Sequence, residues 1–125
     1  MKNGRYHCEV FLPDELASRF NAINVNLRYT FHAREEAAQD ELGAVAEGQL
    51  PRHLAGAEWQ LVGAEVERGA VVSVIARRAF DSRRDLVMAV KFTDEPAGRA
   101  RVATLWTNHR GNQHGGRRRW GYVTE

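Results

Sequence analysis

The chain has 125 residues, of which 43% are hydrophobic and 27% charged, and its formal net charge is +2. This length fits one domain over residues 1–125, and the composition is that of a folded globular protein, which excludes a disordered or collagen-like chain. No apolar run approaches the roughly 20 residues that cross a bilayer, and the first residues do not resemble an export signal. The single cysteine, Cys8, excludes an internal disulfide. We therefore expect a cytoplasmic protein without a membrane segment.

The first half of the chain predicts one strand followed by helices. Alternating side chains predict a strand at residues 5–11. A proline and two acidic residues then open an amphipathic helix over residues 13–23. A second helix is predicted over residues 29–42 with Gly43 as its stop, and Pro51 opens a brief third one.

The second half changes to the period of a β-sheet. Arg68-Gly69 is a hairpin signal, and polar turn residues at 81–84 and 94–98 separate the next apolar runs. Four consecutive strands joined by short turns form an antiparallel meander. They are predicted at residues 59–67, 71–78, 86–92 and 101–107.

These elements together predict an α+β fold. One face of a four-stranded antiparallel sheet must be covered, and the material available is the N-terminal helical layer of residues 13–54. The sequence thus predicts a helical layer packed on a four-stranded antiparallel sheet.

Charge is distributed unevenly along the chain. Acidic residues cluster between 35 and 47, whereas residues 99–124 contain none. The basic segment 108–125 is expected to be partly flexible, and clustered arginines predict RNA or another polyanion as a partner. The aromatic residues there fit either base stacking or a closing strand. The predicted nucleic-acid-binding residues are Arg78, Arg101, Arg110, Arg117, Arg118, Arg119 and Trp120.

Several polar side chains fall at strand ends. Arg77 lies at the end of the second meander strand, and Thr104 and Asn108 share one face of the last. His114 follows in a polar loop. A histidine can move protons near neutral pH, an arginine can neutralise a phosphate, and threonine and asparagine can orient its oxygens. This set suits metal-free cleavage of RNA, in which the 2′-hydroxyl is the nucleophile.

Short motifs also resemble a known group of proteins. The segments Thr30–Glu35, Arg77–Asp81 and Thr104–Asn108, followed by a histidine, resemble small phage and bacterial proteins of the RelE-like branch of the barnase-EndoU-colicin-RelE ribonuclease superfamily. The resemblance implies the same layered RelE-like ribonuclease fold and toxin-like RNA cleavage without metal or cofactor. The catalytic residues it implies are His32, Arg77, Thr104, Asn108 and His114.

Other functions remain open from the sequence. A lysine common in the family is replaced by Ser73, and the acidic pair before the last histidine is missing. Both changes favour a non-enzymatic protein that binds nucleic acid or inhibits a host protein, and an antitoxin is a further expected partner. A third reading makes the acidic helix face of Glu35, Glu36 and Asp40 the binding surface. The five histidines show no zinc spacing, so no metal site is expected.

Overall fold

The computed structural model describes the backbone of residues 1–112 and 119–123. It describes the side chains of residues 1–8 and 12–112. Within this part of the chain, eight strands accompany two α-helices and two single-turn 3-10 helices, the latter at Glu47–Gln49 and Gly56–Glu58. The α-helices are α1 (Asp14–Asn21) and α2 (Phe31–Ala38). The strands are β1 (Gly4–Phe11), β2 (Asn24–Tyr29), β3 (His53–Ala55), β4 (Gln60–Glu67), β5 (Ala70–Ala79), β6 (Arg84–Lys91), β7 (Arg99–His109) and β8 (Arg119–Val123).

The predicted meander is confirmed as strands β4 to β7, each antiparallel to the next. Its first turn holds Arg68 and Gly69 at φ of 50° and 75°, the left-handed conformation that tight hairpins require. In the second turn the side chain of Asp81 accepts hydrogen bonds from the backbone N–H groups of Arg83 and Arg84, both at 2.8 Å. Local turn chemistry therefore specifies this part of the fold.

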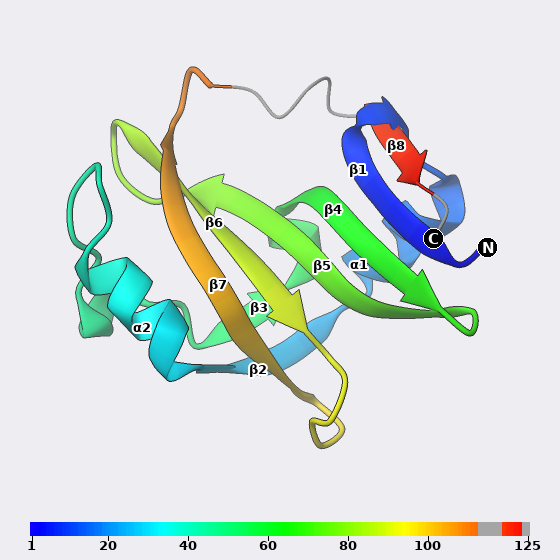
Figure 1. Ribbon diagram of the computed structural model, residues 1–125, viewed down its shortest axis with the longest axis horizontal. Coiled ribbons are helices and arrows are strands. Elements are labelled where there is room, and N and C mark those ends of the chain that lie inside the picture. The colour runs from blue at the N-terminus through cyan, green and yellow to red at the C-terminus, as the bar shows by residue number, and fades with distance from the viewer. Residues whose placement is uncertain (113–118, 124–125) are drawn as a thin grey trace.

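The predicted four-stranded sheet under a helical layer is wrong, and with it the RelE-like architecture. The sheet has eight strands in the order β3-β2-β7-β6-β5-β4-β1-β8, and β2 runs parallel to β7 while the other neighbours are antiparallel. Segments from both ends of the chain extend the meander on its two sides. Figure 1 shows the resulting sheet strongly bent, with β1 and β8 at one end and β2 and β3 at the other.

The helices are too short to form a layer over so wide a sheet. The first predicted helix is confirmed as α1, but α2 ends at Ala38, short of the predicted Leu42. The third predicted helix is absent, since Pro51 leads into the short strand β3. Residues 24–29, which the prediction left unassigned or gave to a helix, alternate polar and apolar side chains and form β2.

The hydrophobic core lies on one face of the sheet, between the strands and the helices. Leu16 and Phe20 of α1 and Ala33 and Ala37 of α2 are buried there. The strand residues that meet them come mostly from alternate positions, and a register shift in β7 brings both Val102 and Leu105 to this face. They include Val66, Val74, Ala76, Leu86, Met88, Val90, Val102 and Leu105.

Helix α2 protects a free edge of β7. Strand β2 ends at Tyr29, opposite Val102, whereas β7 continues to His109. Beyond that point Glu36 accepts a hydrogen bond from the backbone N–H of Leu105 at 3.2 Å, and Asp40 accepts one from that of Thr107 at 2.8 Å. Two of the three acids assigned to an outward binding face therefore point at the sheet, and only Glu35 is exposed without such a bond among the described residues.

Candidate functional site

The face of the sheet opposite the core, here called the outer face, carries no helix of the described residues. Because side chains alternate along a strand, the positions between the core residues all point to this side. Strand register then determines which of them are neighbours. Two rows of outer-face residues, each crossing the strands, result from the pairing.

The first row is rich in positive charge. We call it the cationic row. Each member is the register partner of the next one on the neighbouring strand, in the order β2, β7, β6, β5, β4 and β1. It consists of Arg28, Arg101, Lys91, Ser73, Glu65 and Arg5. With strands about 4.8 Å apart, a row over six strands is about 24 Å long. Four cations and one acid thus form a line across the outer face.

The cations of this row differ in their partners. Arg5 contacts Glu65 at 3.3 Å and its side chain is 73% exposed, so the ion pair is readily exchanged. Lys91 is exposed and makes no ion pair or hydrogen bond within the described part of the chain. The middle of the cationic row therefore offers a free ammonium group.

Glu95, in the turn between β6 and β7, engages the other end of the row. Its carboxylate accepts hydrogen bonds from Arg28 Nε and Nη2 at 2.8 and 2.7 Å, and lies 3.5 Å from Arg101 Nη1. The hydrogen bonds from Arg28, assisted by the charges of Arg28 and Arg101, lower the pKa of Glu95 below its ordinary 4.5. The same contact raises the pKa of Arg28.

This pair predicts a stability effect that depends on pH. A carboxyl whose pKa is lowered by folding stabilises the folded state above its unfolded pKa, and that contribution is lost as the pH falls through the folded pKa. Glu95→Gln should therefore lower the melting temperature near about pH 7, and its difference from the wild type should vanish towards about pH 3. The exposed Glu67, which has no ion pair among the described residues, provides the control Glu67→Gln. A difference that persists at low pH would contradict the prediction.

The second row lies beside the first, and we call it the floor row. It is offset by two residues along β1, β4, β5 and β6, and by three along β7, where the register shifts. It consists of Thr104, Ala89, Ile75, Gly63 and His7. Same-face residues are about 7 Å apart along a strand, so the two rows are parallel and adjacent. Most members of the floor row are small or apolar. The row is therefore a strip of mainly uncharged side chains beside the charged residues of the cationic row.

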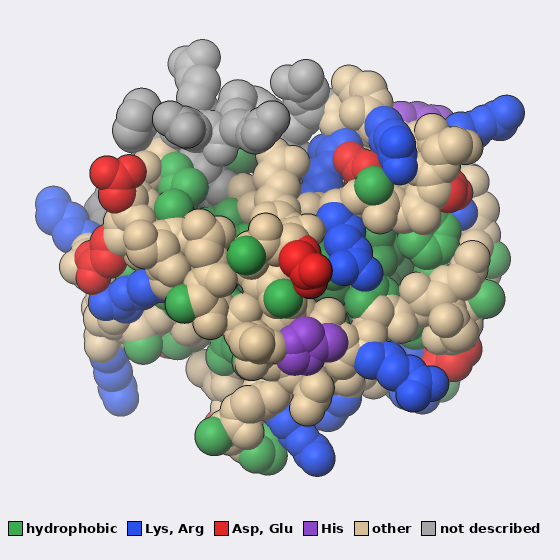
Figure 2. Space-filling model, turned by 180° about the vertical axis from the view of Figure 1, so that it is seen from behind, with side chains coloured by type: hydrophobic (Ala, Val, Ile, Leu, Met, Phe, Trp, Pro, Cys, Tyr) green, Lys and Arg blue, Asp and Glu red, His purple; other side chains and the backbone are tan. Residues whose placement is uncertain are grey.

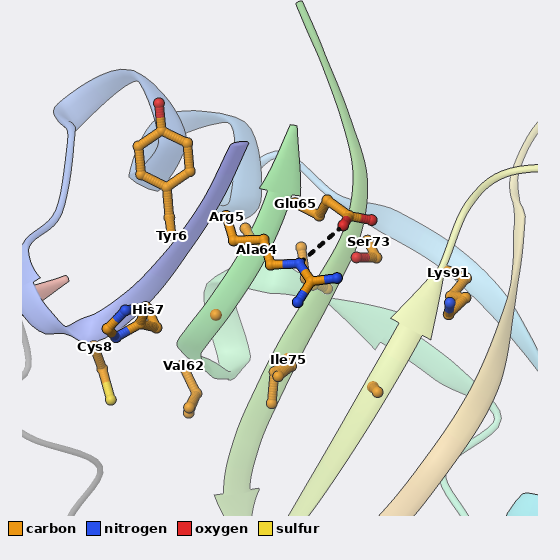
Figure 3. Close-up of a pocket in the computed structure, with 13 residues that line it drawn as sticks. Arg5, Tyr6, His7, Cys8, Val62, Ala64, Glu65, Ser73, Ile75 and Lys91 are labelled. Carbon is orange, nitrogen blue, oxygen red and sulfur yellow. Dashed lines mark hydrogen bonds and ion pairs between the residues drawn. The ribbon is translucent and has the colours of Figure 1, made fainter. Parts of the chain in front are cut away.

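The two rows enclose a hollow of about 450 Å³ over β1, β4, β5 and β6. Figure 3 shows Arg5, Ser73 and Lys91 around it on three different strands, with Ile75 and Val62 beside them. The lining is mainly apolar at the floor and polar at the rim. This combination suits an amphipathic anion, whose flat apolar part lies on the sheet and whose charge meets the rim.

Arg77, predicted as the catalytic cation, lies on the outer face but is only 4% exposed. Its Nε donates to Asp85 at 2.8 Å, and its Nη2 donates to the backbone carbonyls of His109 and Asn112 at 3.1 and 2.6 Å. These bonds fix the turn that follows β7. A guanidinium enclosed in this way orients the backbone and does not face a ligand.

The other predicted catalytic residues are only partly brought together. Thr104 lies in the floor row, and Asn108 lies further along the same face of β7, where it accepts a hydrogen bond from Asn112. His32 is on α2, 71% exposed and 3.3 Å from Glu36, and no described contact joins it to Arg77 or the β7 residues. His114 lies outside the described residues. The described part of the chain therefore does not assemble the predicted acid–base set.

The predicted nucleic-acid-binding residues also separate. Arg101 is in the cationic row, Arg78 stacks over Trp59 at 4.3 Å, and Arg110 lies 3.7 Å from Asp85. Arg117 and Arg118 lie outside the described residues, as do the side chains of Arg119 and Trp120, whose backbone is in β8.

The sequence prediction missed Arg5, Lys91, Arg28 and the glycine of the floor row. The alternation of side chains within each strand can be read from the sequence. These residues become neighbours, however, only through the register of the strands, which the sequence does not show.

The rest of the described surface gives less evidence of a binding site. On the side of the molecule seen in Figure 2, Lys and Arg side chains are spread out with Asp and Glu among them, so they form no single basic block. Where the structure describes the chain, no three His, Cys, Asp or Glu side chains are grouped to hold a metal ion. Neither α-helix of the described residues has the length and apolar character to cross a membrane.

No family model, curated protein or solved structure matches this chain.

Proposed function

We propose that the outer face of the sheet binds single-stranded RNA and does not cleave it. The observation that carries the proposal is the cationic row with the free ammonium of Lys91 at its centre, set beside an apolar floor row. Phosphates are attracted by such a row whatever the sequence, and the released counterions supply the free energy of binding. The proposal does not depend on the RelE-like fold.

A single strand fits this surface better than a duplex. Sheets that bind single strands combine a basic track for the backbone with a platform for exposed bases. The floor row carries no helix of the described residues, and unpaired bases can lie on it while their phosphates meet the adjacent cations. A duplex keeps its bases stacked inside and would leave the floor row unused.

The proposal favours binding over cleavage because of the state of the predicted catalytic groups. Cleavage needs a base, an acid and a cation around one phosphate. Arg77 is enclosed by Asp85 and two backbone carbonyls, and His32 is on a separate helix. The metal-free cleavage implied by the family resemblance stays a prediction, and incubating the RNA with the protein and running a denaturing gel tests it.

The proposal predicts how binding responds to salt. For a single strand, each phosphate contact adds about 0.7 to the slope of log affinity against log salt. Lys91→Gln should lower the slope for a fluorescent RNA oligonucleotide by about 0.7 and weaken binding several-fold at low salt. Arg83→Gln is the matched control, because Arg83 is an exposed cation in the β5–β6 turn, away from both rows. Equal slopes for Lys91→Gln and the wild type would refute the proposed interface.

A further inference from the structure

Gly63 lies in the lining of the hollow between the two rows. Gly63 lies inside β4, opposite Ile75 on one side and His7 on the other. Its φ is not in the left-handed region, so the backbone does not require glycine there. A glycine inside a strand weakens the sheet and often marks a place where a ligand comes close to the backbone. The missing side chain therefore needs an explanation in terms of space.

Gly63 is buried, and the side chain of Ile75 lies against the place that a side chain at position 63 would take. A Cβ at this position would lie 3.3 Å from Cδ1 of Ile75 and 3.4 Å from the backbone oxygen of Tyr6. Alanine would therefore be tolerated after small shifts, whereas a larger side chain must rise into the hollow. Ala89, the floor-row residue across Ile75, is also small. The apolar strip from Gly63 over Ile75 to Ala89 forms the floor of the hollow, and we call it the slot.

Charge and polarity at the rim identify the ligand. Arg5 of β1 and Lys91 of β6 lie in the cationic row along one side of the slot. Ser73 and Glu65, the ion-pair partner of Arg5, lie between them. A purely apolar ligand would leave these groups unused, and a free phosphate would leave the floor unused. A volume of about 450 Å³ lies within the range of small-ligand sites.

We infer that this slot holds one unpaired base of a single-stranded RNA, with its neighbouring phosphates on Lys91 and Arg5. The inference rests on the proposed function, because it assigns the part of the RNA that the floor row contacts. It goes further by separating two contributions to binding. The rim accounts for the salt-dependent part, and the slot accounts for a part that requires the base.

The experiment compares two probes on the full chain. One is a uridine oligonucleotide, and the other is an abasic ribose-phosphate chain of the same length. The wild type should bind the first about tenfold more tightly, with similar salt slopes for both. Gly63→Val should lose this preference and keep the slope, and Ala89→Leu should do the same from β6, on the other side of Ile75. Gly48→Val, at an exposed glycine with open space around it, should behave like the wild type.

The outcomes separate the inference from the proposed function. Equal binding of the two probes by the wild type, with a clear salt slope, would overturn the slot and leave the proposed interface intact. Retention of the preference in a folded Ala89→Leu and a folded Gly63→Val would overturn it as well. No binding of either probe by the wild type would overturn both. Melting curves of each variant establish that it is folded, and Ala89→Leu provides the test if Gly63→Val does not fold.

Discussion

Gly56→Ala is expected to unfold the protein under conditions in which the wild type is folded. Gly56 follows β3, is buried, and donates its backbone N–H to the carbonyl of Ile23 at 2.8 Å. A Cβ added there would lie 1.7 Å from the backbone oxygen of Phe20 and 2.7 Å from its carbonyl carbon. Both atoms belong to α1, so the helix would have to move away from the core. We expect a loss of more than ~4 kcal/mol, close to the whole stability of an ordinary domain.

The measurement is urea unfolding followed by circular dichroism, with Gly48→Ala as the matched control. Nothing lies within 4 Å of a Cβ at Gly48, so that variant should stay within ~0.5 kcal/mol of the wild type. A folded Gly56→Ala with a midpoint close to that of Gly48→Ala would show that α1 does not pack against residue 56 as described.

Arg77→Met should destabilise the fold strongly. It leaves Asp85, whose side chain is 18% exposed, without its main partner, and removes the donors to the two carbonyls of the turn after β7. Breaking a buried ion pair by removing one member costs about 3–5 kcal/mol. Arg110, 3.7 Å from the other oxygen of Asp85, offsets part of this loss, so we expect the lower end of that range.

A double-mutant cycle tests the assignment of Arg77. Arg77→Met and Asp85→Asn should each lower the free energy of unfolding, and together they should cost clearly less than their sum, because they break the same interaction. Arg83→Met is the control, because Arg83 is an exposed arginine in the turn between β5 and β6. It should change the free energy of unfolding little. An Arg77→Met variant as stable as the wild type that loses an RNA-cleaving activity would instead support the catalytic role predicted from the sequence.

The parts of the fold that sequence predicts correctly are those set by local chemistry. The β4–β7 meander follows from alternation between turns whose residues, such as Gly69 and Asp81, favour a reversal of the chain. Helix α1 follows from the spacing of Leu16 and Phe20. The prediction failed where pairing is distant in sequence. Strand β2 reads Asn-Val-Asn-Leu-Arg-Tyr, a clear alternation, but its parallel partner β7 begins about 70 residues later.

The candidate site was harder to predict for the same reason. Arg5, Ser73 and Lys91 become neighbours only when the register of three strand pairs is known, and irregularities at Val62 and between Glu65 and Val66 shift the register of β4 against β5. Arg77 was recognised as a strand-end arginine, but its role is decided by Asp85 and by the turn after β7. Residue type indicated polar chemistry in both cases, and only tertiary structure separated a surface cation from a buried one.

The contact between α2 and β7 also bears on how this chain behaves at high concentration. A strand with unpaired N–H groups can recruit a strand from another molecule, and repeated recruitment leads to aggregation. Glu36 and Asp40 occupy the N–H groups of Leu105 and Thr107 with carboxylates, which accept hydrogen bonds but cannot donate one. A second chain approaching there meets no free N–H at Leu105 or Thr107 and two negative charges. Two acidic side chains, Glu36 in α2 and Asp40 just after it, thereby discourage self-assembly along β7.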